Sequence, residues 1–445
     1  MSLQDEIMQT LTTQVGEQSE YLQAVNAACD EIIPVYQANE QYKQHNVLRR
    51  LLSPDQVIEF KVEWEDDEHQ ARVNRGWRIQ HSQLLGPYKG GTRFTPSCTE
   101  SILKFLAFEQ SFKNALSGLS LGAGKGGADF DPKNASVNEI RRFCNAYMNQ
   151  LSRYIGAKTD VPAGDIGVSS TELGWMFGQY LRTNKKYDGQ LSGKPVQLAG
   201  SELRVQATGF GLIYFLQDVL AHQEQALEGK KLAFSGAGNV AIHGAIKAVE
   251  RGAKVISLSN SRGTYIDEGG MSADDLKWLK QDGATEKNAL ASLAQNAKGE
   301  YDKHATPWEL TFDVALPCAT QNEIDESKAQ HIVNSGASTL IEGANMPCTS
   351  DAQKLLQESG LIYVPGKAAN AGGVVLSGFE MQQNADFTYR SADSLDKQLQ
   401  DTMQSIHRAC IDESQRAQET TCNYARSATV AGFRRLADAM VMSGY

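Results

Sequence analysis

The pattern of apolar and polar residues predicts both strands and helices in the first half of the chain. The two types alternate over 57–63, which predicts a strand, and residues 72–81 predict a second strand after a charged turn. Two strands joined in this way indicate a hairpin or part of a mixed sheet. Apolar residues at helical spacing predict helices within 1–50, where we expect packing or assembly, and over 137–156.

A glycine-rich segment separates the second strand from the next helix. Gly86–Arg93 follows the strand, and its glycine and proline residues predict a loop that carries Lys89. Ser97 and Glu100 have the spacing of a capping box, which predicts that a helix begins here and ends near Ser117.

Lys125 lies in a second glycine-rich segment, which we also expect to form a loop. Glycine lets another group approach the backbone closely, and a lysine in a partly dry site can act as a base. The alternative is a flexible surface loop with a solvated lysine. Asp165 follows later, between Gly164 and Gly167. The glycines around Lys125 are Gly122, Gly124, Gly126 and Gly127.

The pattern changes after residues 188–201, which are rich in Gly, Ser and Pro. A predicted helix over 207–222 precedes a strand that begins at 231. The strand runs into a Gly-x-Gly-x-x-Ala turn at Gly236, Gly238 and Ala241. The following helix reaches about 251 and leads to a strand over 254–259. This order is the context that a dinucleotide-binding fingerprint requires.

Three more segments read as buried strands, and the C-terminal part as mostly helical. The strands are at 311–317, 339–343 and 361–364, and 375–445 is expected to return to the first domain. We therefore predict an α/β fold of two domains with a cleft between them. The substrate and assembly domain has a mixed sheet and comprises 1–200 with 374–445, and a Rossmann-like domain comprises 201–373.

Composition narrows the class of protein. The chain has 445 residues and a net charge of −10, which argues against a nucleic-acid partner bound through a basic surface. Its seven cysteines are scattered and form no CxxC pair, so we expect a reducing compartment and no zinc site. We see no secretory signal and no run long enough to cross a membrane. These features predict a cytoplasmic protein without a membrane partner.

Three lysines and one aspartate carry the candidate chemistry. Lys89, Lys113 and Lys125 would suit a dicarboxylate if they converged on one pocket, with one ammonium group left for catalysis. Periodicity does not show this convergence, and a lone lysine is usually solvated.

The residues at the end of the strand over 254–259 indicate whether NAD or NADP is the cofactor. An acid at this place would hold the 2′-hydroxyl of NAD, but the sequence has none before Asp267. Arg262 is close enough to pair with a 2′-phosphate, so NADP is favoured and NAD stays open. Cys318–Thr320, Asn345 and Asn370 follow predicted strands and are candidates for contacts with ribose and nicotinamide. Bonds within turns are the alternative for each asparagine.

Several motifs closely resemble the hexameric glutamate dehydrogenases, in particular the small biosynthetic NADP-type enzyme. The resemblance runs in one register over nearly the whole chain. Its motifs are Gly86-Pro-Tyr-Lys-Gly-Gly, Phe108-Glu-Gln-Ser-Phe-Lys-Asn-Ala-Leu116, Gly124-Lys-Gly-Gly, Thr159-Asp-Val-Pro-Ala-Gly-Asp-Ile-Gly167, Ala207-Thr-Gly-Phe-Gly211, Ala315-Leu-Pro-Cys-Ala-Thr-Gln-Asn-Glu323 and Pro365-Gly-Lys-Ala-Ala-Asn-Ala-Gly-Gly373.

The resemblance implies a role for each matching position. Lys125 resembles the catalytic lysine, whose neutral amine activates water or polarises the carbonyl, and Asp165 resembles the carboxylate that shuttles a proton. The implied substrate positions are Gln110 and Lys113 for the α-carboxylate, and Lys89, Ser377 and Arg204 for the side-chain carboxylate, with Gly90 beside Lys89. The implied cofactor positions are Thr208, Gly236, Gly238, Asn239, Val240, Asn260, Arg262, Ala319, Thr320, Asn345 and Asn370.

The implied reaction joins 2-oxoglutarate and ammonium to give L-glutamate, reversibly, with NADPH, in a homohexamer that runs toward synthesis. Three departures from the family pattern are present. Ala123 replaces a glycine, which is a small change, and Val205-Gln206 replaces Pro-Glu. Asn260 and Arg262 stand where those enzymes often show Ser-Asp-Ser-Ser-Gly, which leaves the cofactor preference open and, through the loss of a negative charge, favours NADP. Two other functions stay open. One is the same fold acting on a branched or aromatic amino acid, against which Lys89 argues, and the other is a catalytically silent nucleotide-binding protein.

Overall fold

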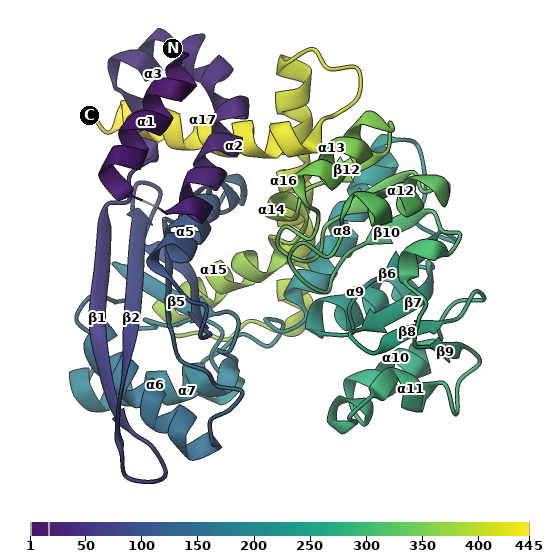
Figure 1. Ribbon diagram of the computed structural model, residues 1–445, viewed down its shortest axis with the longest axis horizontal. Helices are drawn as coiled ribbons and strands as arrows, with labels where there is room; N and C mark the ends of the chain where they lie inside the picture. The colour runs from purple at the N-terminus through teal and green to yellow at the C-terminus, as the bar shows by residue number, and fades with distance from the viewer. Residues whose placement is uncertain (1, 17, 445) are drawn as a thin grey trace. The chain divides into compact units, whose positions relative to one another are not determined.

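The computed structural model describes residues 2–16 and 18–444, and it divides into two compact units (Figure 1). The first unit comprises the chain up to Arg204, Val374–Leu395 and the chain from Thr429. The second unit comprises Val205–Gly373 and Asp396–Ala428. The predicted division placed all of 374–445 with the first domain, whereas Asp396–Ala428 makes its contacts within the second unit.

The first unit contains a mixed sheet of five strands in the order β1-β2-β4-β3-β5. The long strands β1 and β2 pair in antiparallel fashion, so the predicted hairpin is confirmed. β4 is antiparallel to β2 and parallel to β3, and β3 is also parallel to β5. The strands are β1 (Gln56–Glu65), β2 (Ala71–Ser82), β3 (Tyr88–Phe94), β4 (Ala123–Ala128) and β5 (Asp160–Gly164).

Helices with one apolar face cover this sheet. Phe143 and Tyr147 on α6 and Phe177 on α7 are fully buried and belong to the same core as Phe94 of β3. The helices are α1 (Leu3–Val15), α2 (Ser19–Gln37), α3 (Glu40–Gln44), α4 (Val47–Leu51), α5 (Glu100–Leu116), α6 (Val137–Leu151), α7 (Ser170–Asn184), α15 (Gly372–Ala385) and α17 (Tyr424–Met442).

Two predicted helix boundaries were wrong. The cap of α5 is Thr99, whose hydroxyl accepts a hydrogen bond from the Ile102 backbone, and not the pair Ser97 and Glu100. α6 ends at Leu151 and not at residue 156. In both cases, neighbouring residues also satisfied the local pattern, and a cap depends on backbone geometry that spacing does not fix.

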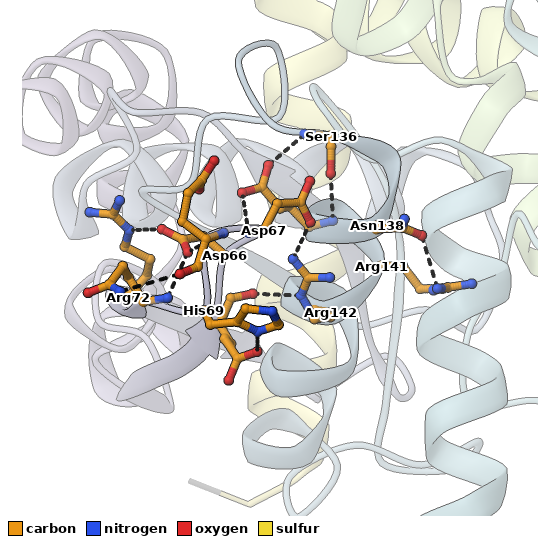
Figure 2. A network of polar contacts seen from close by, with 12 residues as sticks. Asp66, Asp67, His69, Arg72, Ser136, Asn138, Arg141 and Arg142 are labelled. Carbon is orange, nitrogen blue, oxygen red and sulfur yellow. Dashed lines mark hydrogen bonds and ion pairs between the residues drawn. The ribbon is translucent and has the colours of Figure 1, made fainter.

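The turn between β1 and β2 is held to the first turns of α6 (Figure 2). The Asp66 carboxylate accepts hydrogen bonds from the backbone N–H groups of Glu68 and Gln70, and it pairs with Arg72 at 2.6 Å. Arg142 reaches from α6 to the Asp67 carboxylate at 2.6 Å. These bonds fix the hairpin turn by its own polar side chains and by one helix.

Lys89 and Lys125 lie in strands and not in loops, so both loop predictions were wrong. Lys89 is in β3 and Lys125 is in β4, within the sheet. The glycines around them allow backbones to approach closely: a Cβ atom on Gly90 would lie 1.6 Å from the carbonyl oxygen of Gly124. Because glycine has no side chain, these strands show no alternation of apolar and polar residues, and the sequence pattern does not predict them.

The second unit contains a sheet of seven strands in the order β12-β11-β10-β6-β7-β8-β9. β12, β11, β10, β6 and β7 run parallel to one another. The short strands β8 and β9 were not predicted; β8 pairs antiparallel with β7, and β9 pairs antiparallel with β8. The strands are β6 (Lys231–Phe234), β7 (Lys254–Asn260), β8 (Gly263–Ile266), β9 (Glu300–Asp302), β10 (Val314–Leu316), β11 (Thr339–Ile341) and β12 (Ile362–Val364).

Helices alternate with the parallel strands of this sheet along the chain, as the Rossmann-like prediction requires. The predicted helix over 207–222 is confirmed as α8 (Ala207–His222), and the helix after the glycine turn is confirmed as α9 (Asn239–Glu250). The others are α10 (Ala273–Lys280), α11 (Ala289–Leu293), α12 (Glu326–Asn334), α13 (Ser350–Glu358), α14 (Gly366–Ala369) and α16 (Ala392–Arg416).

Two kinds of feature are absent from the described residues. Within 2–16 and 18–444, no helix has the length and apolar character needed to cross a membrane. The same part of the chain contains no group of three or more His, Cys, Asp and Glu side chains arranged to hold a metal ion.

Candidate active site

Lys125 and Asp165 form the centre of a charged cluster in the first unit. Lys125 Nζ lies 2.9 Å from Asp165 Oδ2, and only 8% and 16% of their side chains are exposed. β4 carries the lysine, and the aspartate directly follows β5. Arg93, at the end of β3, donates from Nε to the same carboxylate oxygen at 3.0 Å. The sequence reasoning missed Arg93, which only the sheet order brings beside Asp165.

The two cations decide the charge state of Asp165. Burial raises the pKa of this carboxyl, but Lys125 and Arg93 lower it by more, and the result is a pKa of about 2. Asp165 is therefore ionised near neutral pH. A buried carboxylate in contact with an ammonium group can accept or return a proton at short range.

A hydrogen bond fixes the Lys89 backbone, whereas the ammonium group of the side chain is available to a ligand. Its side chain is 1% exposed, and among the described residues no carboxylate lies within ion-pair distance of it. Asn114 on α5 donates to the Lys89 carbonyl oxygen at 3.1 Å and to the Gly122 carbonyl oxygen at 2.6 Å. Gln110 donates to the Asn114 oxygen at 2.6 Å. Asn114 was not predicted, because its role depends on two strands that were read as loops.

Positive charge predominates around this group of residues. Burial lowers the pKa of Lys113 to about 7, with a further contribution from Lys125. Burial also lowers the pKa of Lys89 well below its usual value, with contributions from Arg204 and Arg78. Arg204 donates from Nε to the Ser377 hydroxyl at 3.2 Å. Cations that are partly or fully buried and disfavour one another would be stabilised by an anion with more than one negative charge.

The structure thus brings the predicted substrate residues into one unit and one electrostatic neighbourhood. Arg78 and Asp160 complete it as a buried bidentate pair, with distances of 2.9 Å from Nε to Oδ2 and 2.5 Å from Nη2 to Oδ1. Arg78 also donates to the Gly90 carbonyl oxygen at 3.3 Å. Because its carboxylate partner is already bound, this arginine supports β3 and does not offer a free charge.

The glycine turn of the second unit has the geometry of a phosphate site. Gly236 has φ of +82°, and a Cβ atom there would lie 2.8 Å from the Cys318 carbonyl oxygen. Gly238 caps α9 and has no side chain that could bond the first N–H groups of the helix. A Cβ atom on Gly238 would meet nothing within 4 Å, so the helix N-terminus is open to a ligand. These residues fit a pyrophosphate, which the helix N–H groups and dipole favour.

Loops at the carboxyl ends of the parallel strands lie beside this turn. Asn370 donates to the carbonyl oxygens of Gly343 and Ala344 and to the side-chain oxygen of Asn345, at 2.9 to 3.2 Å. Its amide group therefore makes the turn bonds that were the alternative to cofactor contact. Ala319, Thr320 and Asn345 are exposed, and Thr208 and Val240 are half-buried in the first turns of α8 and α9.

The end of β7 places Arg262 beside the backbone of Lys287. The Asn260 side-chain oxygen accepts a hydrogen bond from the Arg262 backbone at 2.8 Å. The Arg262 guanidinium donates to the carbonyl oxygen of Lys287, and both side chains are exposed. Sequence reasoning missed Lys287, because 25 residues separate it from Arg262. The guanidinium group at this strand end suits a phosphate group.

Comparison with known proteins identifies the family. The family model described as Glutamate/Leucine/Phenylalanine/Valine dehydrogenase matches residues 199–444, and the model of the Glu/Leu/Phe/Val dehydrogenase dimerisation domain matches residues 54–182. The chain belongs to the Glu/Leu/Phe/Val dehydrogenase family.

Individual relatives cover nearly the full length of the chain. It is 45% identical to an NADP-specific glutamate dehydrogenase of Psychrobacter sp. (strain TAD1), over 96% of each chain. It is 41% identical to an NAD(P)-specific glutamate dehydrogenase of Xylanibacter ruminicola, over 99% of each chain. The fold matches a crystal structure of Plasmodium falciparum glutamate dehydrogenase with a TM-score of 0.96 and 39% identity, over 99% of this chain and 94% of that chain.

Membership of the Glu/Leu/Phe/Val dehydrogenase family agrees with the architecture described above. The first unit contains the matched dimerisation region, and the second unit contains the nucleotide-binding fold. The predicted family and two-domain α/β class are therefore confirmed. The role of each individual side chain stays a prediction.

Proposed function

We propose that this protein catalyses the reversible NADP-dependent conversion of 2-oxoglutarate and ammonia to L-glutamate, and that it runs toward synthesis. The observation that carries the proposal is the group of Lys89, which is buried, with Lys113 and Arg204, which are partly buried, near the Lys125–Asp165 pair. This is a surplus of positive charge suited to a dicarboxylate, with a proton donor and acceptor beside it. The glutamate dehydrogenase relatives support the same substrate.

Each carboxylate of the substrate has its own cations in this proposal. Lys113, with Gln110 on the same face of α5, binds the α-carboxylate. Lys89, with Arg204 and Ser377, binds the distal carboxylate. A substrate without the distal carboxylate would leave Lys89 buried and unpaired, which is costly. The site therefore disfavours leucine and other apolar amino acids.

Lys125 and Asp165 carry the proton transfers. Ammonia attacks the ketone carbon, Asp165 takes a proton from the nitrogen, and the Lys125 ammonium protonates the oxygen to give a carbinolamine. Asp165 then returns its proton to the carbinolamine hydroxyl, the C–O bond breaks, water leaves and an iminium remains. Bound NADPH supplies the hydride that reduces it. In the reverse direction, Lys125 as a neutral amine activates the water that attacks the iminium.

The cofactor residues are proposed from the shape of the second unit. The open N-terminus of α9 would hold the pyrophosphate, with Gly236 and Gly238 allowing its approach. Arg262 and Lys287 would hold the 2′-phosphate of NADP. The remaining contacts proposed are those of Thr208, Asn239, Val240, Asn260, Ala319, Thr320 and Asn345, with Asn370 holding the Asn345 side chain in place.

We also propose that the protein is a cytoplasmic homohexamer. The matched dimerisation region supports self-association, and the scattered free cysteines support a reducing compartment. Sedimentation equilibrium would give the number of subunits, and a mass other than six chains would contradict the hexamer.

The direct test of the proposed activity is a rate comparison. The purified protein is supplied with 2-oxoglutarate, ammonium and either NADPH or NADH, and cofactor oxidation is followed by absorbance. We expect rapid oxidation of NADPH and slower oxidation of NADH. Absence of oxidation with both cofactors would refute the activity, and faster oxidation of a leucine-derived 2-oxo acid would refute the substrate.

Replacing Arg262 with alanine is expected to raise the KM for NADPH about tenfold and to change that for NADH less than about twofold. The reason is that only NADPH presents a 2′-phosphate to the guanidinium. Initial rates with each cofactor give both constants. An equal change for the two cofactors would show that Arg262 does not bind this phosphate.

Binding of a dicarboxylate is expected to weaken as the pH rises above about 7. Lys113 has a pKa of about 7 in the free protein, and an anionic ligand favours its charged form. Below pH 7 the Lys113 side chain of the free protein is already protonated. Above pH 7 the ligand must bind together with a proton, and the affinity therefore falls by up to about tenfold per pH unit. Titration calorimetry with glutarate at pH 6, 7 and 8 measures this.

The same titrations on a Lys113→Met variant provide the control. Its glutarate affinity is expected to be lower and to vary less with pH, because the titrating group is gone. A wild-type affinity that stays constant from pH 6 to pH 8 would contradict the prediction.

A further inference from the structure

A fully buried ion pair in the first unit has no part in the proposed chemistry. Lys194 Nζ lies 2.7 Å from Glu380 Oε1, and both side chains are 0% exposed. The other carboxylate oxygen, Oε2, accepts a hydrogen bond from the Gly193 backbone at 2.8 Å. Lys194 also donates to the Leu191 carbonyl oxygen at 2.6 Å and to the Asn384 side chain at 2.9 Å. Such complete pairing is what a buried charge needs in order to be retained.

Glu380 belongs to a row of side chains on α15 that bind one segment of chain. Positions 377, 380 and 384 are three and four residues apart and therefore share a helix face. Ser377 accepts from Arg204 at 3.2 Å, and Asn384 donates to the Ala199 carbonyl oxygen at 2.8 Å. Glu380 lies between Ser377 and Asn384 on this face and binds Gly193 and Lys194 of the same segment.

The bound segment has little structure of its own. Between the end of α7 and Arg204, the described chain has only the short 3-10 turn Val196–Leu198. Arg204 stands at the end of this segment, and Ser377 stands one turn before Glu380 on α15. Because the Lys194–Glu380 pair joins this segment to α15, it helps to hold both Arg204 and Ser377, the two residues that support the proposed distal-carboxylate site.

The charge of Glu380 also reaches the substrate cations. Burial lowers the pKa of Arg204, and Glu380 opposes this by raising it. Glu380 likewise raises the pKa of Lys89 against the larger effects of burial, Arg204 and Arg78. Because Lys194 neutralises Glu380 directly, the carboxylate does not itself occupy the place of an anionic ligand.

We propose that Glu380, anchored by Lys194, is a positioning residue that makes the site selective for substrates with a distal carboxylate. It acts by holding Arg204 and Ser377 in place and by favouring the charged form of Lys89. This inference rests on the proposed function, since it assumes that these three residues bind the distal carboxylate. It predicts an effect confined to that end of the substrate.

The test compares two ligands that differ only at the distal end. Glutarate has five carbons and two carboxylates, and pentanoate has five carbons and one. Glu380→Gln keeps the size of the side chain and an oxygen for the Gly193 N–H, but it removes the charge. We expect calorimetry to show glutarate affinity reduced about tenfold and pentanoate affinity changed less than about twofold.

Turnover gives a second measurement of the same selectivity. In Glu380→Gln, the ratio of kcat/KM for 2-oxoglutarate to that for 2-oxopentanoate is expected to fall about tenfold, mainly through the KM for 2-oxoglutarate. Glu380→Asp keeps the charge and is expected to recover part of the ratio. If Glu380→Gln does not fold, Lys194→Gln replaces it. Release of Glu380 toward Arg204 should then weaken glutarate binding by a similar factor.

Asp66→Asn is the matched control in the same unit. Asp66 is also a buried carboxylate that pairs with an arginine and accepts backbone N–H groups (Figure 2). Asp66 is far from the site. It precedes Ala71, the first residue of β2, whereas Ile79, the cross-strand partner of Lys125, lies eight residues further along that strand, which is roughly 26 Å. We expect both ligand affinities of this variant to equal those of the wild type.

The outcomes separate the inference from the proposed function. Equal weakening of glutarate and pentanoate, or a fall in kcat with an unchanged substrate ratio, would show a merely structural role and overturn the inference. A wild-type protein that does not oxidise NADPH with 2-oxoglutarate and ammonium refutes the proposed function instead. The contrast between glutarate and pentanoate binding can still be measured in that case.

Discussion

Replacing Lys125 with alanine is expected to lower kcat by about 10³-fold or more, because the variant lacks the group that donates and accepts the proton of the substrate oxygen. Lys125 is in contact with Asp165 at 2.9 Å and is nearly buried, so water cannot simply replace it. The loss should appear in kcat for both directions of the reaction. Initial rates with saturating 2-oxoglutarate, ammonium and NADPH measure it.

Dinucleotide binding separates a catalytic loss from a folding loss. All the proposed cofactor residues lie in the second unit, so the dissociation constant of the variant for NADPH, measured by fluorescence, should stay within about twofold of the wild type. Lys133→Ala removes an exposed lysine of the first unit and should leave kcat unchanged. Turnover near the wild-type value in the Lys125→Ala variant would refute the catalytic assignment.

The features that could be predicted from the sequence were those with a local signal. The β1–β2 hairpin follows from alternation, and the turn at Gly236 follows from the order of strand, glycines and helix. The identity of the charged residues also came from the sequence, through motifs that resemble a known family. What the motifs did not contain was the set of partners that orient these residues.

Partners from distant segments could not be predicted, because no local pattern records them. Arg93 meets Asp165 only because β3 and β5 are neighbours in the sheet. Lys287 meets Arg262 through a loop 25 residues away, and Glu380 meets Lys194 across 186 residues. Each of these contacts depends on topology, which spacing along the chain does not determine.

The glycine-rich strands β3 and β4 show a second limit of prediction from the sequence. Segments rich in glycine usually predict loops, since glycine is costly in regular structure. β3 and β4 contain glycine for another reason, which is the space that their close backbones require. The same glycines that obscured the strands therefore make a sharp prediction about stability.

Replacing Gly90 with alanine is expected to destabilise the first unit by about 3 kcal/mol or more, among the largest effects of any single substitution here. Its Cβ atom would lie 1.6 Å from the Gly124 carbonyl oxygen, a distance that only a shift of the backbone can relieve. β3 is bonded to β4 on one side and to β5 on the other, so it cannot move freely. Differential scanning calorimetry should show the melting temperature of this unit lowered by roughly 10 °C.

Gly178→Ala is the matched control, and it should have the opposite sign. Gly178 lies within α7, and a Cβ atom there would meet only the Arg182 guanidinium, at an ordinary distance of 3.6 Å. Alanine restricts the unfolded chain and favours the helix, so we expect a gain of about 0.5 to 1 kcal/mol. If Gly90→Ala melted at the wild-type temperature, the backbones of β3 and β4 would not be as close as described. The glycines beside Lys89 and Lys125 would then need another explanation, because space in the sheet would no longer require them.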